Sequence, residues 1–481
     1  MVASPPSWLS TALLICILPL FAGCTDSTSS SDRPNILLIS IDSLRSDHLG
    51  CYGYAQPTSP FIDELASRGA RFENAVSTTS WTLPAHAAML TGLNDSTHGL
   101  VDNGLRLSDD HLTLAELLQD QGYATAGFFG APYLHPTFGL GQGFDFYQSC
   151  MSEAAEDGKV VRNSARSNLA PSHSDVTGPR TREFVKTWAD SLAKDESWFC
   201  FLHLWDVHYD FIPPEAYINL FDPDYTGSID GRLMSNADIN REMSPRDLRH
   251  VQALYDAEIR FTDDILRGIF DDLEARDMLA NTLVILTADH GEEFFEHGNK
   301  GHNKTLFEEV VRVPLIINWP GQIDAGRVIK EQAQIIDFMP TVASAVGFSG
   351  ALAVQGRDLS PQLAGLTSEP RSALLELLID QSSQRALRTN DWKLIEPREG
   401  TPTYWFDLQQ DPGEKRAIGP DVPAATVEGQ ARANAEAELR ETLRKQALMS
   451  KALARRGPDS IEVPPDVLKD LQGLGYLGDD D

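Results

Sequence analysis

The chain has 481 residues, 42% of them hydrophobic, and carries 40 basic against 70 acidic side chains, a formal net charge of −30. That length is enough for one large α/β domain and a smaller companion. Because so acidic a surface repels nucleic-acid phosphates, we predict no nucleic-acid partner. It also repels anionic substrates at long range, so an anion site here needs local positive charge, most simply a metal ion.

The N-terminal segment predicts export. Residues 8–22 are apolar, too few for a confident membrane span but as many as a signal-peptide core has. Phe-Ala-Gly-Cys at 21–24 resembles a bacterial lipobox, and a Ser-rich run follows it. We therefore predict a lipoprotein-type signal peptide over 1–24, lipidation at Cys24 and a tether over 25–33. The protein would be periplasmic or in the cell envelope, with the lipid anchor as its contact with the membrane.

From residue 34 the pattern alternates between strands and helices. Continuous apolar runs are typical of parallel strands buried on both faces. The expected strands are 35–41, 124–129, 198–204, 283–287 and 313–319, and the expected helices are 59–68, 112–121, 181–193 and 244–276. This alternation predicts an α/β fold over 34–350, with a doubly wound, mostly parallel sheet flanked by helices.

The pattern changes in the last part of the chain. Short segments between 370 and 417 predict a small antiparallel sheet, and residues 424–455, rich in Ala, Glu, Arg and Leu, predict a helix. We assign 351–481 to a smaller C-terminal subdomain.

Polar side chains follow three of the predicted strands. Asp42 follows the first, Asp206 and His208 the middle one, and Asp289 and His290 a later one. Ligands of open α/β sheets sit at the carboxyl ends of strands. Carboxylates and imidazoles that converge there are a ligand set for a divalent cation.

A further candidate is Thr82, which precedes Leu83 and Pro84. Proline suits the first turn of a helix, so Thr82 would lie beside free N–H groups and the positive end of the helix dipole. An anionic tetrahedral ester would bind there, with a metal lowering the pKa of the hydroxyl. Taken alone, Thr82 is better explained as a plain helix N-cap.

Together these segments resemble the sulfatase family of the alkaline phosphatase superfamily. The matching segments are Asn35-Ile-Leu-Leu-Ile-Ser-Ile-Asp42, His48-Leu-Gly-Cys-Tyr-Gly53, Thr82-Leu-Pro-Ala-His-Ala-Ala-Met-Leu-Thr-Gly92, Ala288-Asp-His-Gly-Glu292, Glu296-His-Gly298, Lys304-Thr-Leu-Phe-Glu-Glu-Val-Val-Arg-Val-Pro314, Asp337-Phe-Met-Pro-Thr341 and Tyr404-Trp-Phe-Asp-Leu-Gln-Gln-Asp-Pro-Gly-Glu414. The resemblance implies an alkaline phosphatase-like fold and a metal-dependent ester hydrolase.

The resemblance also implies site roles. One divalent cation, calcium in most sulfatases and otherwise manganese or zinc, would be bound by four residues: Asp42, Ser43, Asp289 and His290. His208 would contact the ester or its leaving group. The charged oxygens of the substrate would be bound by Lys304 or by His302, since the register is ambiguous by one or two positions.

One motif departs from the family pattern. Sulfatases of the usual kind carry Cys-x-Pro-x-Arg, whose cysteine is oxidised to formylglycine, and some use serine in its place. Here Thr82 stands at the cysteine position and His86 at the arginine position. We take both as catalytic candidates. Oxidation of threonine would give a ketone instead of an aldehyde, so we predict that no formylglycine forms.

Three functions stay open at this point. The first is hydrolysis of an anionic sulfate ester of a carbohydrate, lipid or aryl alcohol by metal-assisted attack of Thr82. The second keeps the fold but makes the substrate a phosphate mono- or diester or a phosphonate, for a hydrolase or a transferase. Two-metal phosphoesterases need a second metal site, for which Asp206, His208 and His302 are the candidates here. The third is a non-catalytic surface lipoprotein.

Overall fold

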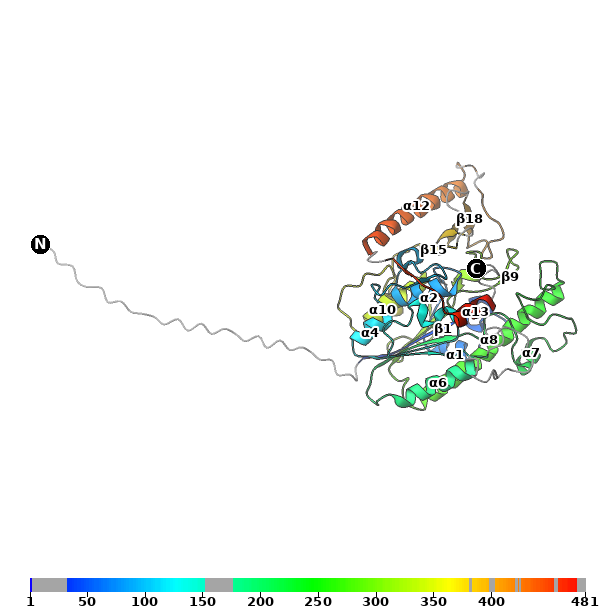
Figure 1. Cartoon of the computed structure of the whole chain (residues 1–481). Coiled ribbons are helices and arrows are strands. Elements are labelled where there is room, and N and C mark those ends of the chain that lie inside the picture. Colours follow the sequence, from blue (N-terminus) through cyan, green and yellow to red (C-terminus); the bar gives the residue numbers. More distant parts are fainter. Residues whose placement is uncertain are drawn as a thin grey trace.

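An eight-stranded sheet runs through the centre of the molecule (Figure 1). The computed structural model describes residues 33–151, 176–379, 383–397, 403–419, 425–453 and 457–473, with residues 1 and 423. In order across the sheet the strands are β13 (Arg327–Ile329), β2 (Ala70–Phe72), β12 (Leu315–Asn318), β8 (Thr282–Thr287), β1 (Asn35–Ile41), β7 (Trp198–Leu204), β5 (Ala124–Phe129) and β6 (Phe146–Ser149).

The sheet is mostly parallel, as predicted. Strand β12 runs antiparallel to both of its neighbours, and the other pairings are parallel. Figure 1 shows helices on both faces of the sheet. They are α1 (Pro60–Arg68), α6 (Gly178–Ser191) and α8 (Pro245–Glu274) on one face, and α2 (Thr82–Thr91), α4 (Leu114–Asp120) and α10 (Phe338–Ala345) on the other.

The central strands have apolar sequences because helices cover both of their faces. Residues 36–41 of β1 and all of β7 and β8 are buried. Strand β1 lies between β7 and β8, with Ile39 opposite both Leu202 and Leu286. These three strands therefore form the core on which the site is built.

One predicted strand is divided in two. The run 313–319 forms β11 (Arg312–Val313), which pairs with β3 (Ala75–Val76), and β12, which joins the large sheet. Pro314 stands between them, and because proline has no N–H it ends the first ladder. Strand β14 (Ala333–Gln334) completes the three-stranded sheet around β3.

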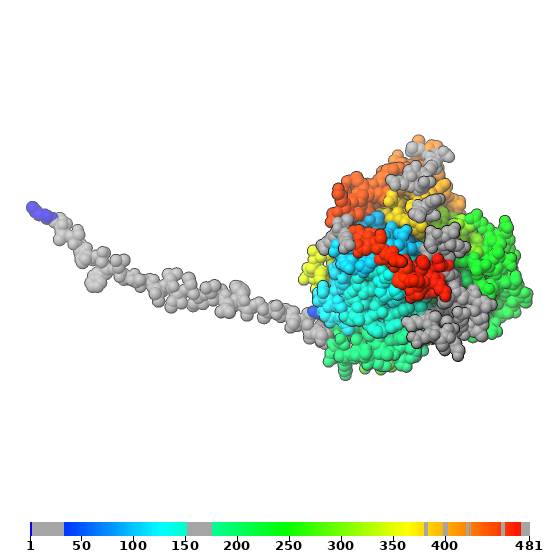
Figure 2. Space-filling view, in the orientation of Figure 1, coloured from blue at the N-terminus to red at the C-terminus, as the bar shows by residue number. Residues whose placement is uncertain are grey.

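The predicted C-terminal antiparallel sheet is present. It contains β15 (Ala373–Leu377), β16 (Gln384–Arg388), β17 (Trp392–Glu396) and β18 (Tyr404–Asp407), of which β16 was not predicted. The predicted helix is α12 (Val427–Leu453), which lies against this sheet. Beyond it, β19 (Asp459–Ser460) pairs with β4 (Leu105–Arg106). Helix α13 (Pro465–Gly473) packs near the short helix Pro132–Leu134. In Figure 2 this C-terminal segment is red and lies against the cyan part of the chain.

The remaining elements are short. They are α3 (Asp95–His98), α7 (Glu215–Phe221), α9 (Glu308–Val311), α11 (Ser360–Leu363), the hairpin of β9 (Glu293–Phe294) and β10 (Lys300–Gly301), and 3₁₀ turns at Ser46–His48, Gly50–Tyr52, Pro136–Phe138 and Ile335–Asp337. Among the described residues no helix combines the length and apolarity that a bilayer crossing requires. Residues 2–32, which include Cys24 and nearly all of the predicted leader and tether, lie outside the described residues, so export and lipidation remain predictions.

Four buried charges join the small sheet to the α/β domain. Arg388 on β16 donates to both carboxylate oxygens of Glu308 on α9, at 2.9 and 2.8 Å. Lys393 on β17 lies 3.2 Å from Glu308 and 3.1 Å from Glu414. Two cations thus balance two anions, so no charge is left buried without a counterion.

Removing one member of this network should destabilise the fold strongly. We expect Arg388→Leu to lower the free energy of unfolding by about 3–5 kcal/mol, because Glu308 would keep a buried and poorly compensated charge. Denaturant melts of purified protein measure this value. Arg444→Leu is the matched control, since Arg444 pairs with Glu441 at the exposed surface of α12, and it should leave the melt unchanged. Equal melts for both variants would contradict the assignment.

Candidate active site

The carboxyl ends of β7, β1 and β8 bring the predicted polar residues together. Asp42 directly follows β1, and Asp289 and His290 follow β8. Because the three strands are parallel neighbours, their ends lie at the same edge of the sheet. Asp42, Asp289 and His290 are fully buried, and each offers a ligand atom within 4.8 Å of the others.

The carboxylate of Asp289 is oriented by the backbone. Its Oδ1 accepts hydrogen bonds from the backbone N–H groups of Ser43 (3.1 Å) and His290 (2.9 Å). Its Oδ2 has no hydrogen-bond partner among the described residues and lies 3.3 Å from His290 Nε2. A buried carboxylate oxygen left without a donor, beside an imidazole nitrogen, fits a bound cation.

The hydrogen bonds of His290 identify its tautomer. Nδ1 lies 2.9 Å from the carbonyl oxygen of Gly291, which can only accept, so Nδ1 carries the proton. The lone pair is then on Nε2, which lies 3.1 Å from Thr82 Oγ1 and 3.9 Å from Asp42 Oδ1. This orientation directs Nε2 of His290, the nitrogen that would bind a metal ion, toward Thr82 and Asp42.

Ser43 supports both carboxylates. Its hydroxyl donates to Asp42 Oδ1 at 2.9 Å while its backbone N–H donates to Asp289. The φ angle of Ser43 is 56°, a left-handed conformation uncommon outside glycine. In this arrangement Ser43 is a hydrogen-bond donor to the predicted ligands.

Thr82 is the first residue of α2, one position later than a cap, with Trp81 before it. All ten residues of α2 are buried, and Pro84 lies in the first turn, where its missing N–H leaves no helical bond unmade. The Thr82 hydroxyl faces His290 Nε2. The predicted nucleophile and the predicted metal ligands therefore lie within one hydrogen bond of each other.

The three residues predicted to contact the substrate, His208, His302 and Lys304, differ in burial and in their neighbours. His208 is buried, donates from Nδ1 to the carbonyl of Tyr209 (2.6 Å) and faces His302 at 5.0 Å between ring centroids. His302 is buried too, with its ring centroid 4.3 Å from that of His290. Lys304 is exposed, and its Nζ donates to the carbonyl of Lys300 at 2.6 Å. His302 thus lies inside the histidine cluster, whereas Lys304 is exposed but close enough for its charge to lower the pKa values of both Glu292 and His302.

Asp206 has a different role from the one considered for it. Its Oδ1 accepts from the backbone N–H of Thr177 (2.8 Å) and its Oδ2 from that of Gly178 (2.6 Å). These groups belong to the start of α6, so Asp206 satisfies a helix N-terminus. Among the described residues it belongs to no group that could hold a metal ion.

Two buried polar residues of the site had no predicted role. His203 is the polar residue within the apolar strand β7, and its Nε2 lies 3.2 Å from Asp42 Oδ2. Glu292 has no hydrogen bond to either carboxylate oxygen among the described residues, and its Oε1 lies 3.4 Å from His302 Nδ1. The sequence signal for His203 was a polar side chain in a strand buried on both faces, which needs a buried partner.

Burial dominates the ionisation of the site. It raises the pKa of Asp42 to about 6 and that of Glu292 well above its ordinary value. It lowers the pKa of His86 and of His203 to about 4. His86 and His203 are therefore neutral near pH 7, and a bound cation would supply the positive charge that these carboxylates lack.

The sequence matches a known family over this region. Residues 34–348 match the sulfatase family, and residues 296–442 match the family of N-sulphoglucosamine sulphohydrolase C-terminal domains. The first match covers well over half of the chain. The chain belongs to the sulfatase family. It is therefore an enzyme of the sulfuric ester hydrolase type, as the resemblance implied.

Known sulfatase relatives span most of this chain. An ulvan-active sulfatase of Formosa agariphila is 26% identical over 408 residues, covering 80% of this chain and 77% of the relative. Human arylsulfatase A is 26% identical and covers 82% and 85%. The multifunctional alkaline phosphatase superfamily protein PehA of Trinickia caryophylli is 26% identical and covers 82% and 93%.

Solved structures confirm the fold of this sulfatase-family enzyme. BT4656 in complex with its substrate D-glucosamine-2-N,6-O-disulfate superposes with a TM-score of 0.72 at 21% identity, covering 86% of this chain and 98% of that one. The phosphonate monoester hydrolase of Agrobacterium radiobacter gives a TM-score of 0.70 at 23% identity, covering 90% and 100%. The predicted alkaline phosphatase-like α/β fold is confirmed.

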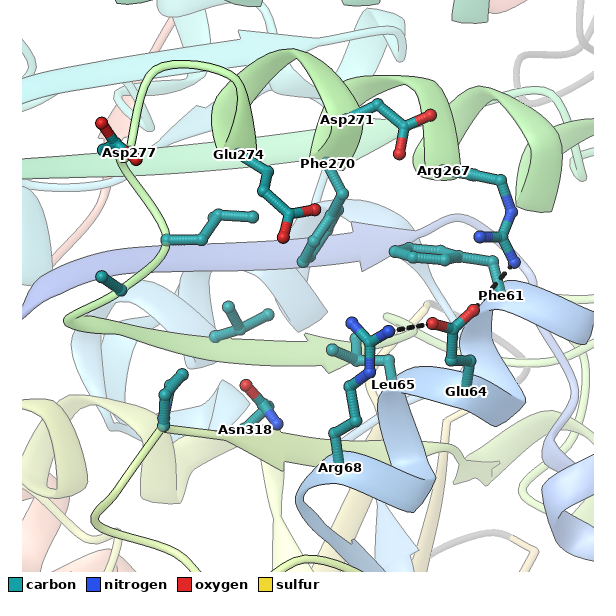
Figure 3. A pocket seen from close by; sticks show the side chains of 14 residues that line it. Phe61, Glu64, Leu65, Arg68, Arg267, Phe270, Asp271, Glu274, Asp277 and Asn318 are labelled. Carbon is teal, nitrogen blue, oxygen red and sulfur yellow. Dashed lines mark hydrogen bonds and ion pairs between the residues drawn. The ribbon is translucent and has the colours of Figure 1, made fainter.

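A separate cavity of about 520 Å³ lies away from the candidate site, between α1 and α8 (Figure 3). It lies beside the start of β8, whereas the site follows the end of that strand. Glu64 pairs there with both Arg68 and Arg267. The cavity contains none of the candidate site residues, so we do not assign the reaction to it.

Proposed function

We propose that the enzyme hydrolyses sulfate esters, with Thr82 as the nucleophile and one divalent cation bound by Asp42, Asp289 and His290. The observation that carries the proposal is the 3.1 Å contact between Thr82 Oγ1 and His290 Nε2, beside the unpartnered Oδ2 of Asp289. When bound, the cation would lower the pKa of the threonine hydroxyl and stabilise negative charge on the transferred group. Calcium, manganese and zinc are all candidates.

The chain's own residues would then carry out two steps. Thr82 Oγ attacks sulfur as the bond from sulfur to the leaving alcohol breaks, and the proton lost by the hydroxyl balances the one that the alcohol gains. Water then attacks the sulfur of the threonine ester, which releases sulfate and restores Thr82. We assign the proton transfers to His302, whose ring centroid lies 4.3 Å from that of His290, and to His208, whose ring centroid lies 5.0 Å from that of His302.

The substrate class we propose is a sulfated carbohydrate. Relatives of the chain include the ulvan-active sulfatase and an N-acetylglucosamine-6-O-sulfatase. Because the chain as a whole is strongly acidic, a polyanionic substrate would be held by local contacts and not by long-range attraction. We also propose that the enzyme is exported and held at the envelope through a lipid on Cys24.

Phosphate or phosphonate ester hydrolysis is the second candidate. Thr82 cannot form the aldehyde through which other sulfatases release their sulfated intermediate, so water must cleave the threonine ester directly, as in a phosphoesterase. A phosphonate monoester hydrolase shares the fold.

Turnover of four ester classes separates these candidates. Purified enzyme is incubated with an aryl sulfate, a phosphate monoester, a phosphate diester and a phosphonate monoester, each with calcium, magnesium, manganese or zinc. Sulfate release that disappears in Thr82→Ala supports the proposal. Turnover of phosphorus esters alone, also lost in the variant, would replace sulfate by phosphate or phosphonate as the substrate.

His302 and Lys304 are expected to differ in their contribution. We expect His302→Ala to lower kcat/KM by about 10²–10³-fold, as removal of one group that contacts the transition state does. Lys304→Ala should lower it less, because Nζ is already bonded to the Lys300 carbonyl at the surface. Steady-state kinetics on the hydrolysed ester compare the two. A larger effect at Lys304 would reverse the assignment.

A further inference from the structure

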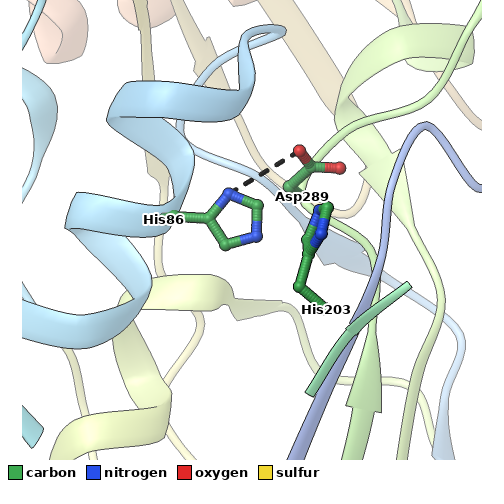
Figure 4. Close-up of side chains that lie close together, drawn as sticks. All are labelled: His86, His203 and Asp289. Atoms are coloured by element: carbon green, nitrogen blue, oxygen red, sulfur yellow. Dashed lines mark ion pairs between the residues drawn. The ribbon is translucent and has the colours of Figure 1, made fainter. Parts of the chain in front are cut away.

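Two buried histidines lie beside the predicted metal ligands. Figure 4 shows His86 from α2 and His203 from β7 beside Asp289. Their ring centroids are 5.0 Å apart, and both side chains are fully buried. Each histidine and Asp289 offer ligand atoms within 4.8 Å of one another, so the three could be taken for a second metal site. Their hydrogen bonds decide against that interpretation.

His203 carries its proton on the nitrogen that faces Asp42. Its Nδ1 lies 3.3 Å from the backbone nitrogen of Gly130, and a backbone N–H can only donate, so Nδ1 accepts. The proton of the neutral ring is then on Nε2, 3.2 Å from Asp42 Oδ2. His203 therefore donates to Asp42 and offers no lone pair to a cation.

His86 also uses both ring nitrogens. Its Nδ1 donates to the carbonyl oxygen of Thr82 at 2.8 Å, and its Nε2 accepts from the hydroxyl of Ser40 at 3.0 Å. These bonds connect the first turn of α2 to β1, two residues before Asp42. His86 thus fixes the backbone of Thr82, and both of its ring nitrogens are engaged in hydrogen bonds.

Asp42 is consequently fixed at both carboxylate oxygens. Oδ1 accepts from the Ser43 hydroxyl and lies 3.9 Å from His290 Nε2, on the side of the other predicted ligands. Oδ2 accepts from His203. One donor lies in the turn after β1 and the other on β7, so together they fix the orientation of the carboxylate.

We propose that His203 is a positioning residue of the metal centre, whose Nε2–H holds Oδ2 of Asp42 so that Oδ1 faces the cation. The inference rests on the metal-dependent function proposed above. Outer-shell partners of metal ligands orient them, and their loss typically weakens metal affinity by about 10–100-fold. His203 would act through Asp42, without touching the substrate or the cation.

A matched pair of amide substitutions tests this role. In His203→Asn the shorter amide keeps an acceptor near Gly130 but lacks a donor that reaches Asp42. In His203→Gln the longer amide keeps a donor at the position of Nε2. Metal-free full-length protein is titrated with calcium, manganese or zinc by calorimetry, and its thermal melt is recorded without metal. We expect His203→Asn to weaken the Kd about 10–100-fold at unchanged stoichiometry, and His203→Gln to restore most of the affinity.

Other results would overturn the inference. Loss of one bound ion per chain in both variants would make His203 a direct ligand. Equal Kd values for wild type, Asn and Gln, even with lowered melting temperatures, would reduce His203 to a packing role. Failure of the wild type to bind any of the ions would overturn the inference and the metal-dependent function together. If metal binding behaves as expected but no sulfate ester is hydrolysed, the substrate proposal fails and the role of His203 stands.

Discussion

Replacing Thr82 with valine is expected to lower kcat by on the order of 10⁵-fold or more, the size of loss seen when a nucleophile is removed from an enzyme that depends on it. Valine keeps the β-branched shape of threonine at a fully buried position, so the first turn of α2 should keep its packing. The hydroxyl that faces His290 is lost. Turnover of whichever ester the wild type hydrolyses measures the effect.

Thr82→Ser is the matched control because it keeps the hydroxyl and removes one methyl group. It should retain much more activity than the valine variant. Mass spectrometry of the peptide that contains residue 82 should show unmodified threonine in the active wild type. Substantial turnover by Thr82→Val, or an oxidised residue at this position, would show that the reaction does not use the threonine hydroxyl.

Loss of the Asp289 carboxylate is the second change with a large expected effect. In Asp289→Ala the oxygen beside His290 Nε2 is gone, and the backbone N–H groups of Ser43 and His290 lose their acceptor. We expect the variant to bind no stoichiometric metal and to lose activity by at least about 10³-fold, because the same ion would activate the nucleophile and stabilise the transferred charge. Elemental analysis after dialysis measures the metal content.

Asp206→Ala provides the comparison for this experiment. Asp206 lies in the loop after β7 but accepts from backbone N–H groups at the start of α6. The variant should therefore lose stability, typically about 1 kcal/mol for a lost helix cap, and keep its metal content. Metal loss in Asp206→Ala but not in Asp289→Ala would place the ion at the other group and contradict the proposed ligand set.

Most of the fold could be predicted because the strands buried on both faces have continuous apolar sequences. Residues 35–41, 124–129 and 198–204 were predicted with the bounds that the structure has. Strand β16 was missed because its sequence, Gln-Arg-Ala-Leu-Arg, contains charged residues whose role depends on partners far along the chain. Likewise, nothing local shows that β19 pairs with β4, more than 350 residues away.

The candidate site was predictable where its residues follow strand ends, as Asp42, Asp289 and His290 do. The sequence could not decide between His302 and Lys304, because the two lie two positions apart and only the path of the loop places one side chain inward. Nor could it separate ligands from supporting residues. That distinction depends on which ring nitrogen carries a proton, and therefore on backbone partners such as Gly130 and Gly291. Gly130 lies outside the quoted motifs. Gly291 lies within one of them, but the motif does not reveal which hydrogen bond its carbonyl accepts.

The position of β1 also determines when the protein can fold. This strand is made first, yet its two neighbours are β7 and β8, which end at Leu204 and Thr287. Until β8 has been synthesised, one edge of an almost wholly apolar strand has no partner, and such edges aggregate. A nascent chain shorter than about 290 residues therefore lacks the β8 side of its central ladder and two of its three proposed metal ligands, Asp289 and His290. In a chain exported unfolded, as we propose for this enzyme, β8 and the two ligands that follow it would emerge only after more than half of the chain, so the proposed metal site would form late in translocation.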